Sequence, residues 1–417
     1  SPVPIVLPAI AGADVGNRIY DAIDFYTKLT TGGTTNYSLA KDIDLEEYRD
    51  PDGNPRTGGW LGPSDYRGTL FGNGYTIKNL ILKTTDIRAG LFHSLAGEAC
   101  LKNFTIEVST EDENSTPNEI YFGGVAADVN STTGNGVLIE DVTVKGTLVV
   151  GSINRFVNIG GIVAVVTSSK LTFRRCAVDL DVKLKGAALA DSRYRSFGGL
   201  VATCGGTLDI EDCRYTGTID VKNSTDSMTR IGGLVGSTWR ADPPVITISN
   251  SYASGRIIAD IGDRVDCTDP TQNDNRYVCI GGLIGYGRPT SSLSITNSAS
   301  LMNEIIVKAD TGSVFQEIYL GRLVGLWDSS ATFTPTNNIV SGAMQIGKKI
   351  GTVLTLDSGF TDDRDSTDGK LVTANANGLY KKQTWTAAAP TGLGWSTDVW
   401  DCDNLSATKL PQLLKEE

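Results

Sequence analysis

Hydrophobic and polar residues alternate in short segments along most of the chain, and these segments return in the same order. Residues 171–175, 208–212 and 246–250 each have apolar residues at their first and third positions and polar residues between and after them. A period of two is the spacing of a β-strand with one buried face. A stretch rich in β-branched residues follows each segment, as at 217–221, and a polar connection of variable length comes next. The pattern predicts strands throughout the middle of the chain.

A phrase of two glycines, two aliphatic residues and a small residue precedes each pair of predicted strands. With the weaker copies at both ends, its second glycine position falls at residues 90, 124, 161, 199, 233, 282 and 322. Self-similarity with a period of about 20–50 residues is typical of stacked repeat proteins. Three strands per repeat, without helical periodicity, predict an all-β protein in which each repeat is one turn of a coil. We expect a right-handed parallel β-helix, a three-sided β-solenoid of about seven coils.

The glycine pairs have two alternative explanations. In residues 231–236 the first, fourth and fifth positions are apolar, and strict alternation cannot bury all three on one face. The backbone must bend there, and glycine tolerates unusual dihedral angles. Alternatively, the glycines make room for close packing inside the coil. Arg322 takes the second glycine position in the last copy, which predicts that this position faces outward.

Stacked coils place equivalent residues in columns, and two columns follow the alternating segments. Cys176 and Cys213 share one column with Ser251 and Ser298, and we expect these small residues to lie in the interior, unreactive. In five coils the position before this column is an aspartate or asparagine, a residue that favours turns and left-handed backbone geometry. We expect this second column to mark the corner between two sheets. Its members are Asp141, Asp212, Asn250, Asn297 and Asn338.

Both ends of the chain depart from the repeat and are predicted to cap the solenoid, because bare terminal strands invite aggregation. Residues 1–58 are expected to form an N-terminal cap with a short helix and leading strands, and residues 346–417 a C-terminal cap. The β-helix spans residues 59–345, and all three parts form one structural unit. Three tryptophans are expected to plug the last coil: Trp385, Trp395 and Trp400.

Composition limits the choice of partners. The 417 residues include 37 Lys and Arg against 48 Asp and Glu, a net charge of −11. Such an acidic surface repels the phosphates of nucleic acids and anionic lipids, so we expect no nucleic-acid partner. No apolar run approaches the roughly 18 residues of a membrane-spanning helix, so no transmembrane segment is expected. A protein or carbohydrate ligand remains as the expected partner.

Two cysteines bracket a polar insertion in the longest repeat. Cys267 and Cys279 stand on either side of a stretch rich in Asp, Asn, Thr and Pro. A disulfide between them would fit an oxidising, extracytoplasmic location. Two unrelated thiols are the alternative explanation.

Candidate catalytic residues are few. His93 is the single histidine, so the helical zinc motif with two histidines is excluded, and a Ser-His-Asp relay has only this residue to use. Glycosidases on parallel β-helices work with paired carboxylates. Glu140 and Asp141 share their columns with Glu211 and Asp212, a placement typical of solvated corner residues. We therefore expect no catalytic residues and no enzyme.

Cofactor sites have equally little support. Residues 50–54 and 363–369 form oxygen-rich turns of the kind that binds calcium, although acidic turns are commonly just solvated. We expect no other cofactor or metal.

The polar connections between repeats carry the variation in length. Because every coil has the same orientation, they should leave the solenoid along one edge as a continuous strip. Loops on a rigid scaffold commonly carry binding function, but they can also be plain solvent loops. The strip comprises residues 111–119, 186–196, 223–230, 260–277 and 310–316.

The repeated phrases resemble a known family. The Gly-Gly-Leu-Val-Gly phrase at 232–236, followed by Asn-Ser-Tyr at 250–252, is similar to the GLUG-motif repeats of bacterial surface proteins. Residues 71–80 resemble the segment that opens such arrays, and Gly394-Trp395 with Trp400 resembles their usual close. The resemblance covers roughly residues 37–414 and carries no catalytic residues.

This resemblance implies a secreted or cell-surface bacterial protein of adhesin type, which displays loops for recognition of host or glycan ligands. GLUG repeats also accompany IgA-peptidase-type enzymes, in which the catalytic unit is separate. The alternative is a polysaccharide lyase or glycoside hydrolase built on a parallel β-helix.

Overall fold

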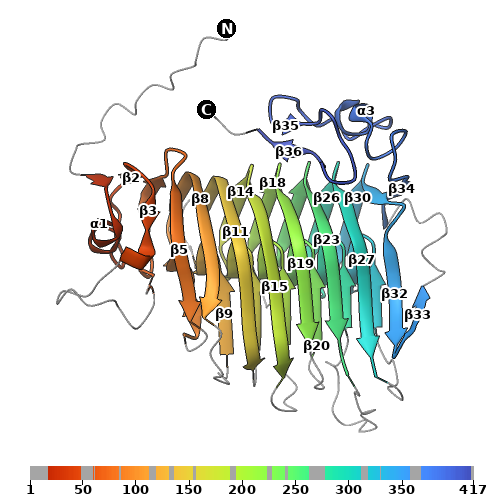
Figure 1. Ribbon diagram of the computed structural model, residues 1–417, viewed down its shortest axis with the longest axis horizontal. Coiled ribbons are helices and arrows are strands. Elements are labelled where there is room, and N and C mark those ends of the chain that lie inside the picture. The colour runs from red at the N-terminus through yellow and green to blue at the C-terminus, as the bar shows by residue number, and fades with distance from the viewer. Residues whose placement is uncertain are drawn as a thin grey trace.

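The chain folds into an elongated parallel β-solenoid, shown by a computed structural model (Figure 1). The predicted fold class is confirmed. The structure describes residues 17–47, 60, 62–83, 86–111, 119–130, 136–153, 156–187, 194–222, 228–239, 243–262, 278–310, 318–328, 330–356 and 368–414.

Two seven-stranded parallel sheets flank the glycine pairs. The pre-glycine sheet contains β6 (Arg88–Ala89), β9 (Glu119–Gly123), β12 (Phe156–Gly160), β16 (Tyr194–Gly198), β20 (Met228–Gly232), β24 (Val278–Gly281) and β28 (Ile318–Gly321). The post-glycine sheet contains β7 (Phe92–Leu95), β10 (Ala126–Val129), β13 (Val163–Val166), β17 (Val201–Cys204), β21 (Val235–Thr238), β25 (Ile284–Gly287) and β29 (Val324–Trp327).

The third side of the solenoid is a 20-stranded sheet, which we call the long sheet. Most coils give it two strands in succession. Its first half contains β1 (Arg18–Ile19), β2 (Tyr37–Leu39), β3 (Ile43–Asp44), β4 (Thr69–Phe71), β5 (Thr76–Lys83), β8 (Cys100–Glu111), β11 (Val137–Ile153), β14 (Lys170–Arg174), β15 (Ala177–Ala187), β18 (Thr207–Glu211) and β19 (Arg214–Lys222). The rest are β22 (Val245–Ser249), β23 (Tyr252–Asp260), β26 (Ser292–Thr296), β27 (Ala299–Ala309), β30 (Thr332–Thr336), β31 (Ile339–Ser341), β32 (Gln345–Ile350), β33 (Val353–Leu356) and β34 (Lys370–Val372).

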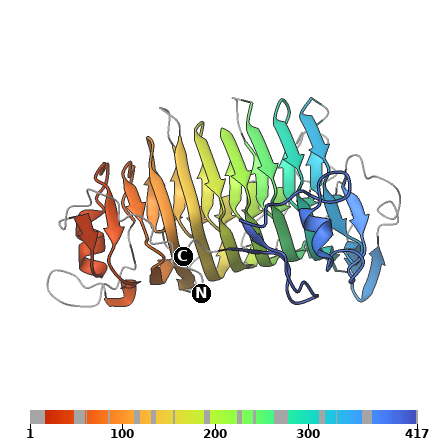
Figure 2. The same ribbon diagram turned by 90° about the horizontal axis from the view of Figure 1, so that it is seen from above.

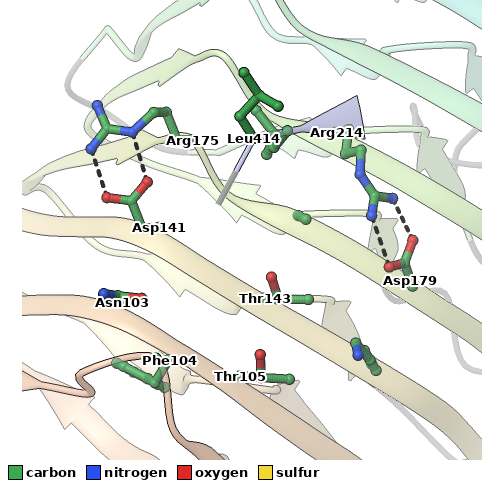
Figure 3. A pocket seen from close by; sticks show the side chains of 13 residues that line it. Asn103, Phe104, Thr105, Asp141, Thr143, Arg175, Asp179, Arg214 and Leu414 are labelled. Carbon is green, nitrogen blue, oxygen red and sulfur yellow. Dashed lines mark hydrogen bonds and ion pairs between the residues drawn. The ribbon is translucent and has the colours of Figure 1, made fainter. Parts of the chain in front are cut away.

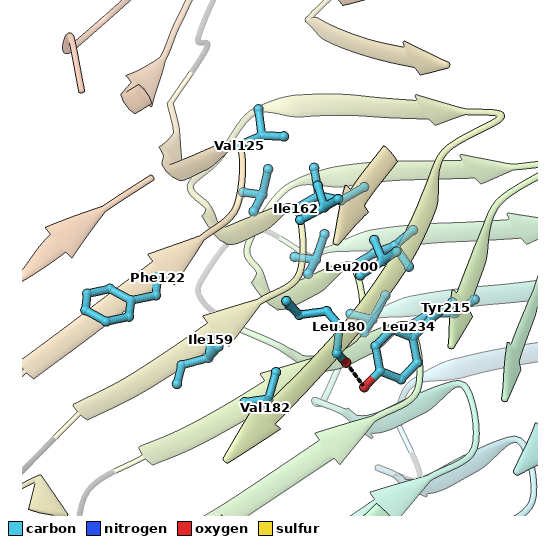
Figure 4. Close-up of a cluster of buried hydrophobic side chains, with 14 of the residues drawn as sticks. Phe122, Val125, Ile159, Ile162, Leu180, Val182, Leu200, Tyr215 and Leu234 are labelled. Carbon is cyan, nitrogen blue, oxygen red and sulfur yellow. Dashed lines mark hydrogen bonds between the residues drawn. The ribbon is translucent and has the colours of Figure 1, made fainter. Parts of the chain in front are cut away.

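Stacked aliphatic and aromatic side chains fill the interior (Figure 4). Ile159 of β12 and Ile162 of the bend that follows are fully buried, as are Leu200 and Leu234 in the coils beyond. Burying a side chain of this size contributes about 1.5–3 kcal/mol to the free energy of unfolding. Tyr215 also reaches into the interior, where its hydroxyl donates a hydrogen bond of 2.9 Å to the carbonyl oxygen of Leu180. The core is one continuous column along the solenoid.

The glycine pairs make room for close packing. None of their residues has the positive φ of a left-handed backbone. A Cβ added to Gly124 would lie 2.6 Å from the carbonyl oxygen of Gly161 and 2.6 Å from Cγ1 of Val144. The chain does bend at each pair, but close packing is what requires glycine there, because a side chain at this position would enter the neighbouring coil.

Arg322 corrects the predicted orientation of the second glycine position. This residue is 2% exposed and does not face outward. Its Nε donates to Oδ2 of Asp368 over 3.0 Å, and Oδ1 of Asp368 accepts the backbone N–H of Leu323 over 2.9 Å. The last coil has space for a side chain here because no further repeat stacks on it, and the carboxylate balances the charge.

The aspartate and asparagine residues at the corners have the left-handed backbone conformation that we expected. The structure corrects the prediction at two points. Asp141, Asp212, Asn250 and Asn297 have φ between 48° and 55°. In the last coil the left-handed residue is Asn337, with φ 52°, and not Asn338. The bend also separates two strands of the long sheet, such as β14 and β15, and not two sheets.

The cysteine and serine column lies in the interior and forms a ladder of hydrogen bonds between coils. The backbone N–H of Cys176 donates to Sγ of Cys213 over 3.3 Å, and that of Cys213 donates to Oγ of Ser251 over 2.9 Å. The ladder continues as the backbone N–H of Ser251 donates to Oγ of Ser298 over 3.2 Å. The N–H of Ser298 in turn donates to Oδ1 of Asn338 over 2.9 Å. The prediction of a buried column is confirmed, and Asn338 belongs to it.

Both ends carry additional elements. At the N-terminal end, helix α1 (Ala22–Lys28) begins at the N-cap Asp21, and a 3-10 turn at Leu45–Glu47 follows β3. Phe25 of α1 packs against Trp60, with ring centroids 5.2 Å apart. At the other end β33 pairs antiparallel with β32. The C-terminal segment adds α3 (Lys382–Thr386), β35 (Trp400–Asp401) and β36 (Gln412–Leu413).

The C-terminal tryptophans cover the flank of the solenoid and not its end. The segment turns back from the last coil towards β18 and β14 (Figures 1 and 2). Trp385, Trp395 and Trp400 surround Tyr252 on the outside of the long sheet, in a cluster separate from the core. Trp400 donates to Oδ1 of Asp212 over 3.1 Å, which anchors the segment at a left-handed corner. The predicted plug is therefore wrong in its location.

Candidate functional site

A cavity of about 230 Å³ lies where the pre-glycine and post-glycine sheets meet, and we call it the corner groove. It spans neighbouring coils in the middle of the solenoid. Its lining combines aromatic and uncharged polar side chains with one arginine: Tyr121, Phe156, Asn158, Val165, Tyr194, Ser196, Thr203, Arg230 and Trp239.

Strand alternation places these side chains outside the core. In β12, Val157 and Ile159 point inward, so Phe156 and Asn158 face out. The glycine pair that follows turns the chain so sharply that the outer faces of the two sheets approach each other. The groove is the angle between them.

Polar side chains join the two sheets across the floor of the groove. The Thr203 hydroxyl donates to Oδ1 of Asn158 over 2.6 Å, and the hydroxyls of Ser196 and Ser237 lie 3.0 Å apart. All four residues are buried, although they face away from the apolar core. Buried hydroxyl and amide groups held in this way are preorganised to orient a ligand.

Charged residues lie at both ends of this row of polar side chains. At one end Arg88 and Asp128 form an ion pair of 2.7 Å, and Thr167 donates to the same carboxylate over 3.1 Å. Burial raises the pKa of Asp128, and the charge of Arg88 opposes this rise. At the other end the guanidinium of Arg230 lies between two rings, 4.8 Å from the centroid of Tyr194 and 4.6 Å from that of Tyr286.

Four partly exposed aromatic residues form the walls of the groove. Phe156 and Tyr194 stack with ring centroids 6.3 Å apart and an interplanar angle of 23°. Tyr121 and Trp239 complete the lining. The Tyr121 hydroxyl is protonated at neutral pH, as in any tyrosine, and burial raises its pKa further, so it can donate a hydrogen bond. The groove therefore offers flat apolar faces beside fixed polar groups.

A second cavity, of about 250 Å³, lies under the end of the C-terminal segment, and we call it the terminal pocket (Figure 3). Two arginine–aspartate pairs stand on opposite sides of it, with Thr105 and Thr143 between them. Its lining is Gly74, Asn103, Phe104, Thr105, Asp141, Thr143, Lys145, Arg175, Ala177, Asp179, Arg214, Leu413 and Leu414.

Both arginine–aspartate pairs of the terminal pocket are bidentate. Nε and Nη2 of Arg175 each lie 2.6 Å from an oxygen of Asp141. Arg214 binds both oxygens of Asp179, one of them over 2.9 Å. The pairs connect adjacent coils, because β11, β14, β15 and β19 pair in register. Leu414 reaches over the space between them (Figure 3).

Among the described residues, His93 has no partner with which it could form a Ser-His-Asp relay. It lies in β7, and its Nδ1 is buried without a hydrogen-bond partner among the described residues. Burial lowers the pKa of His93, and the nearby charge of Arg88 lowers it further. Ser94 donates to Asp65 over 3.0 Å. Within the described part of the chain, His93 forms no hydrogen bond with Ser94 or Asp65, so these three residues do not form a Ser-His-Asp relay.

The two predicted carboxylate pairs are structural. Glu140 binds Lys102 over 2.7 Å and Arg174 over 3.2 Å, and Arg174 also binds Glu211 over 3.2 Å. This ladder alternates positive and negative charges on successive coils. Asp141 pairs with Arg175, and Asp212 accepts the Trp400 indole N–H. None of these carboxylates is arranged as an acid opposite a base.

Several sequence predictions lie partly or wholly outside the described residues. Cys267 is one of them, so its disulfide with the buried Cys279 stays a prediction. Both oxygen-rich turns also lie outside, except for Asp368 and Gly369. So do the five connections of the loop strip, apart from residues at their ends.

The lining of the corner groove was not predicted from the sequence. The available signal was the outward position one residue before the Ile or Phe that starts each glycine phrase, or three residues before it. Phe156 and Tyr194 occupy the same register on adjacent strands there, and Tyr121 stands two residues further along in the preceding coil. Large aromatic residues at outward positions of a solvated sheet indicate a binding surface.

The described residues contain no group of three or more His, Cys, Asp or Glu side chains arranged to hold a metal ion. No described helix is long and apolar enough to cross a membrane.

No family model and no curated protein sequence matches this chain. Two solved structures are similar in fold. One is a candidate immunoglobulin A1 protease from Bacteroides ovatus, with a TM-score of 0.53 and 15% identity over 96% of this chain and 92% of that chain. The other is named IgA1 protease, with a TM-score of 0.51 and 19% identity over 80% of this chain. This chain spans 22% of that longer protein.

These neighbours contradict the expectation that the chain is not an enzyme. Both are named as proteases, and they share the solenoid fold over at least 80% of this chain. The expectation rested on the absence of catalytic motifs from the sequence. That argument fails because such a solenoid also occurs in proteins named for proteolysis.

Proposed function

We propose that this chain is an extracellular bacterial protein of the IgA1-protease-like solenoid type, and that its corner groove binds a carbohydrate chain. The observation that carries the proposal is the pairing of partly exposed aromatic walls with a row of buried neutral polar groups. The repeat phrases, which resemble GLUG-motif repeats of surface proteins, and the names of both structural neighbours support the location.

The chemistry of the groove favours a sugar over other ligands. Sugar rings present one face of C–H groups and an edge of hydroxyls. The rings of Phe156 and Tyr194 offer apolar surfaces for the first, and Asn158, Ser196 and Thr203 offer donors and acceptors for the second. The floor groups already bond to one another, and an apolar ligand would leave their remaining donor and acceptor capacity unused, whereas sugar hydroxyls can use it.

A glycan array tests this proposal. The intact chain should bind a subset of oligosaccharides, and Tyr194→Ala should weaken that binding at least about tenfold, because it removes one wall. Tyr319→Ala is a matched control, since Tyr319 is an exposed tyrosine of β28 in the same sheet and outside the groove. Binding that survives Tyr194→Ala unchanged, or that is lost equally in the control, would contradict the proposal.

Proteolysis is a second candidate, favoured by the names of both structural neighbours. Immunoglobulin A1 is the substrate that those names give. Incubation of the purified chain with immunoglobulin A1, followed by mass analysis of the products, tests this candidate directly. Discrete fragments that appear with this chain and not with heat-unfolded chain would support it, and intact substrate at equimolar chain would argue against it.

A further inference from the structure

We infer that the terminal pocket is a second binding site, which takes the carboxylate of a small acidic sugar or organic acid. It lies on the long sheet, on a different side of the solenoid from the corner groove, and the two lining sets share no residue. The inference is therefore independent of the proposed function.

The pocket has an excess of positive charge. Arg175, Arg214 and Lys145 line it, against Asp141 and Asp179. Each aspartate is held by two bonds from its own arginine, so neither is free to neutralise a third cation. Lys145 is exposed and forms no ion pair with a described acidic residue. Arg175 also contacts Glu140 over 3.1 Å, but Glu140 is shared with Lys102 and Arg174, so a ligand with one negative charge would balance Lys145.

A buried donor of Arg214 provides the second argument. The residue is only 9% exposed, and both of its Nη atoms bind Asp179. Its Nε is buried and has no hydrogen-bond partner among the described residues. Leaving a buried donor without an acceptor costs about 1–3 kcal/mol, and a ligand oxygen would recover this loss. A guanidinium fixed by one carboxylate is preorganised to bind another oxygen anion.

The shape and remaining lining limit the ligand to a small one. The cavity of about 250 Å³ lies below the roughly 300–1,000 Å³ of drug-sized sites, which suits one sugar ring or a short acid. Thr105 and Thr143 offer hydroxyls between the two arginine–aspartate pairs (Figure 3). Leu414 reaches over the pocket (Figure 3), and Leu413 also lines it, so the two present an apolar surface to the rest of the ligand.

Calorimetric titration of the intact chain with glucuronate, acetate and glucose tests the inference. Glucuronate should bind with a Kd of about 1 mM, and glucose should not bind at this site. Acetate distinguishes the two sources of the carboxylate: binding as tight as glucuronate assigns the site to organic acids, and weaker binding assigns it to acidic sugars. Glucuronate binding that is undetectable at about 50 mM would overturn the inference.

Variants place the binding in the pocket. Arg214→Lys keeps the charge but removes Nε, and we expect it to weaken glucuronate binding about tenfold. Because Arg214 is buried, the surface variant Lys145→Met with Thr143→Val provides a second test that does not depend on its folding. Lys183→Met is the matched control, an exposed lysine of β15 outside the pocket. Unchanged affinity in the double variant, or loss of affinity in Lys183→Met or Tyr194→Ala, would overturn the assignment.

Discussion

Arg322 and Asp368 form a buried ion pair at the C-terminal end of the coil interior, with Nε and Oδ2 3.0 Å apart. The arginine replaces the glycine that every internal repeat needs at this position, and the aspartate comes from a segment beyond the repeats. Removing one partner leaves the other charge buried. We expect Asp368→Ala to lower the free energy of unfolding by about 3–5 kcal/mol, measured by urea denaturation.

A matched surface pair separates this effect from loss of any ion pair. Lys382 and Asp403 lie 2.8 Å apart, and both are exposed. Asp403→Ala should therefore leave the free energy of unfolding nearly unchanged, because exposed ion pairs contribute little. Equal effects of the two substitutions would show that Arg322 does not depend on its buried partner.

Replacing Gly124 by alanine should destabilise the solenoid more than the same change at Gly342. The added Cβ at Gly124 meets a backbone oxygen at 2.6 Å, whereas at Gly342 the nearest atom lies at 3.2 Å. Overpacking of this kind costs about 1–3 kcal/mol. Thermal melting of both variants measures the difference. Equal melting temperatures would contradict the close-packing explanation of the glycine phrase.

The cysteine column should resist alkylation. Cys176 and Cys213 are fully buried, and burial raises the pKa of the Cys213 thiol well above its usual value. We expect iodoacetamide to label neither residue at neutral pH until denaturant unfolds the chain. Cys100 is partly exposed and is the internal reference for slow labelling. Labelling of Cys213 as fast as Cys100 would place the column outside the interior.

The stability of the chain should fall as the pH drops below about 6.5, because of its one histidine. Burial lowers the pKa of His93 in the folded state. The unfolded chain therefore binds a proton on this residue at a higher pH than the folded chain does, and folding stability is lost as pH falls through this range. Urea unfolding at pH 5, 6 and 7 should show this slope, and His93→Gln should reduce it. An identical slope in the variant would assign it to other groups.

The repetition in the sequence predicts the fold well because stacking multiplies each local preference. Seven copies of one phrase place the glycines, the apolar columns and the left-handed corners in register, so an error in one coil does not change the architecture. Some exceptions fall in the last coil, where no following repeat constrains the chain: Arg322 replaces a glycine, and Asn337 takes the left-handed corner expected of Asn338. Arg175 is an exception in an internal coil, where it takes the left-handed corner position with φ 49°.

The functional surfaces were harder to predict because they depend on contacts between sheets. Asn158 and Thr203 lie far apart in the sequence, and only the sharp bend at the glycine pair brings their side chains within 2.6 Å. Leu414 lines the same pocket as Arg175 because the C-terminal tryptophans pack on the flank around Tyr252. Neither relationship produces a local pattern that can be recognised in the sequence. Acids, bases and variable loops can be recognised in the sequence, whereas aromatic residues that share an outer sheet face are separated by a whole coil.

A crystal structure of the chain soaked with the oligosaccharide that binds most tightly on the array tests the central claim most directly. We predict density for the sugar in the corner groove, with a ring against Phe156 or Tyr194 and hydroxyls within hydrogen-bond distance of Asn158 or Ser196. Density confined to the loop strip or to another face of the solenoid, with the groove filled only by water, would contradict the account.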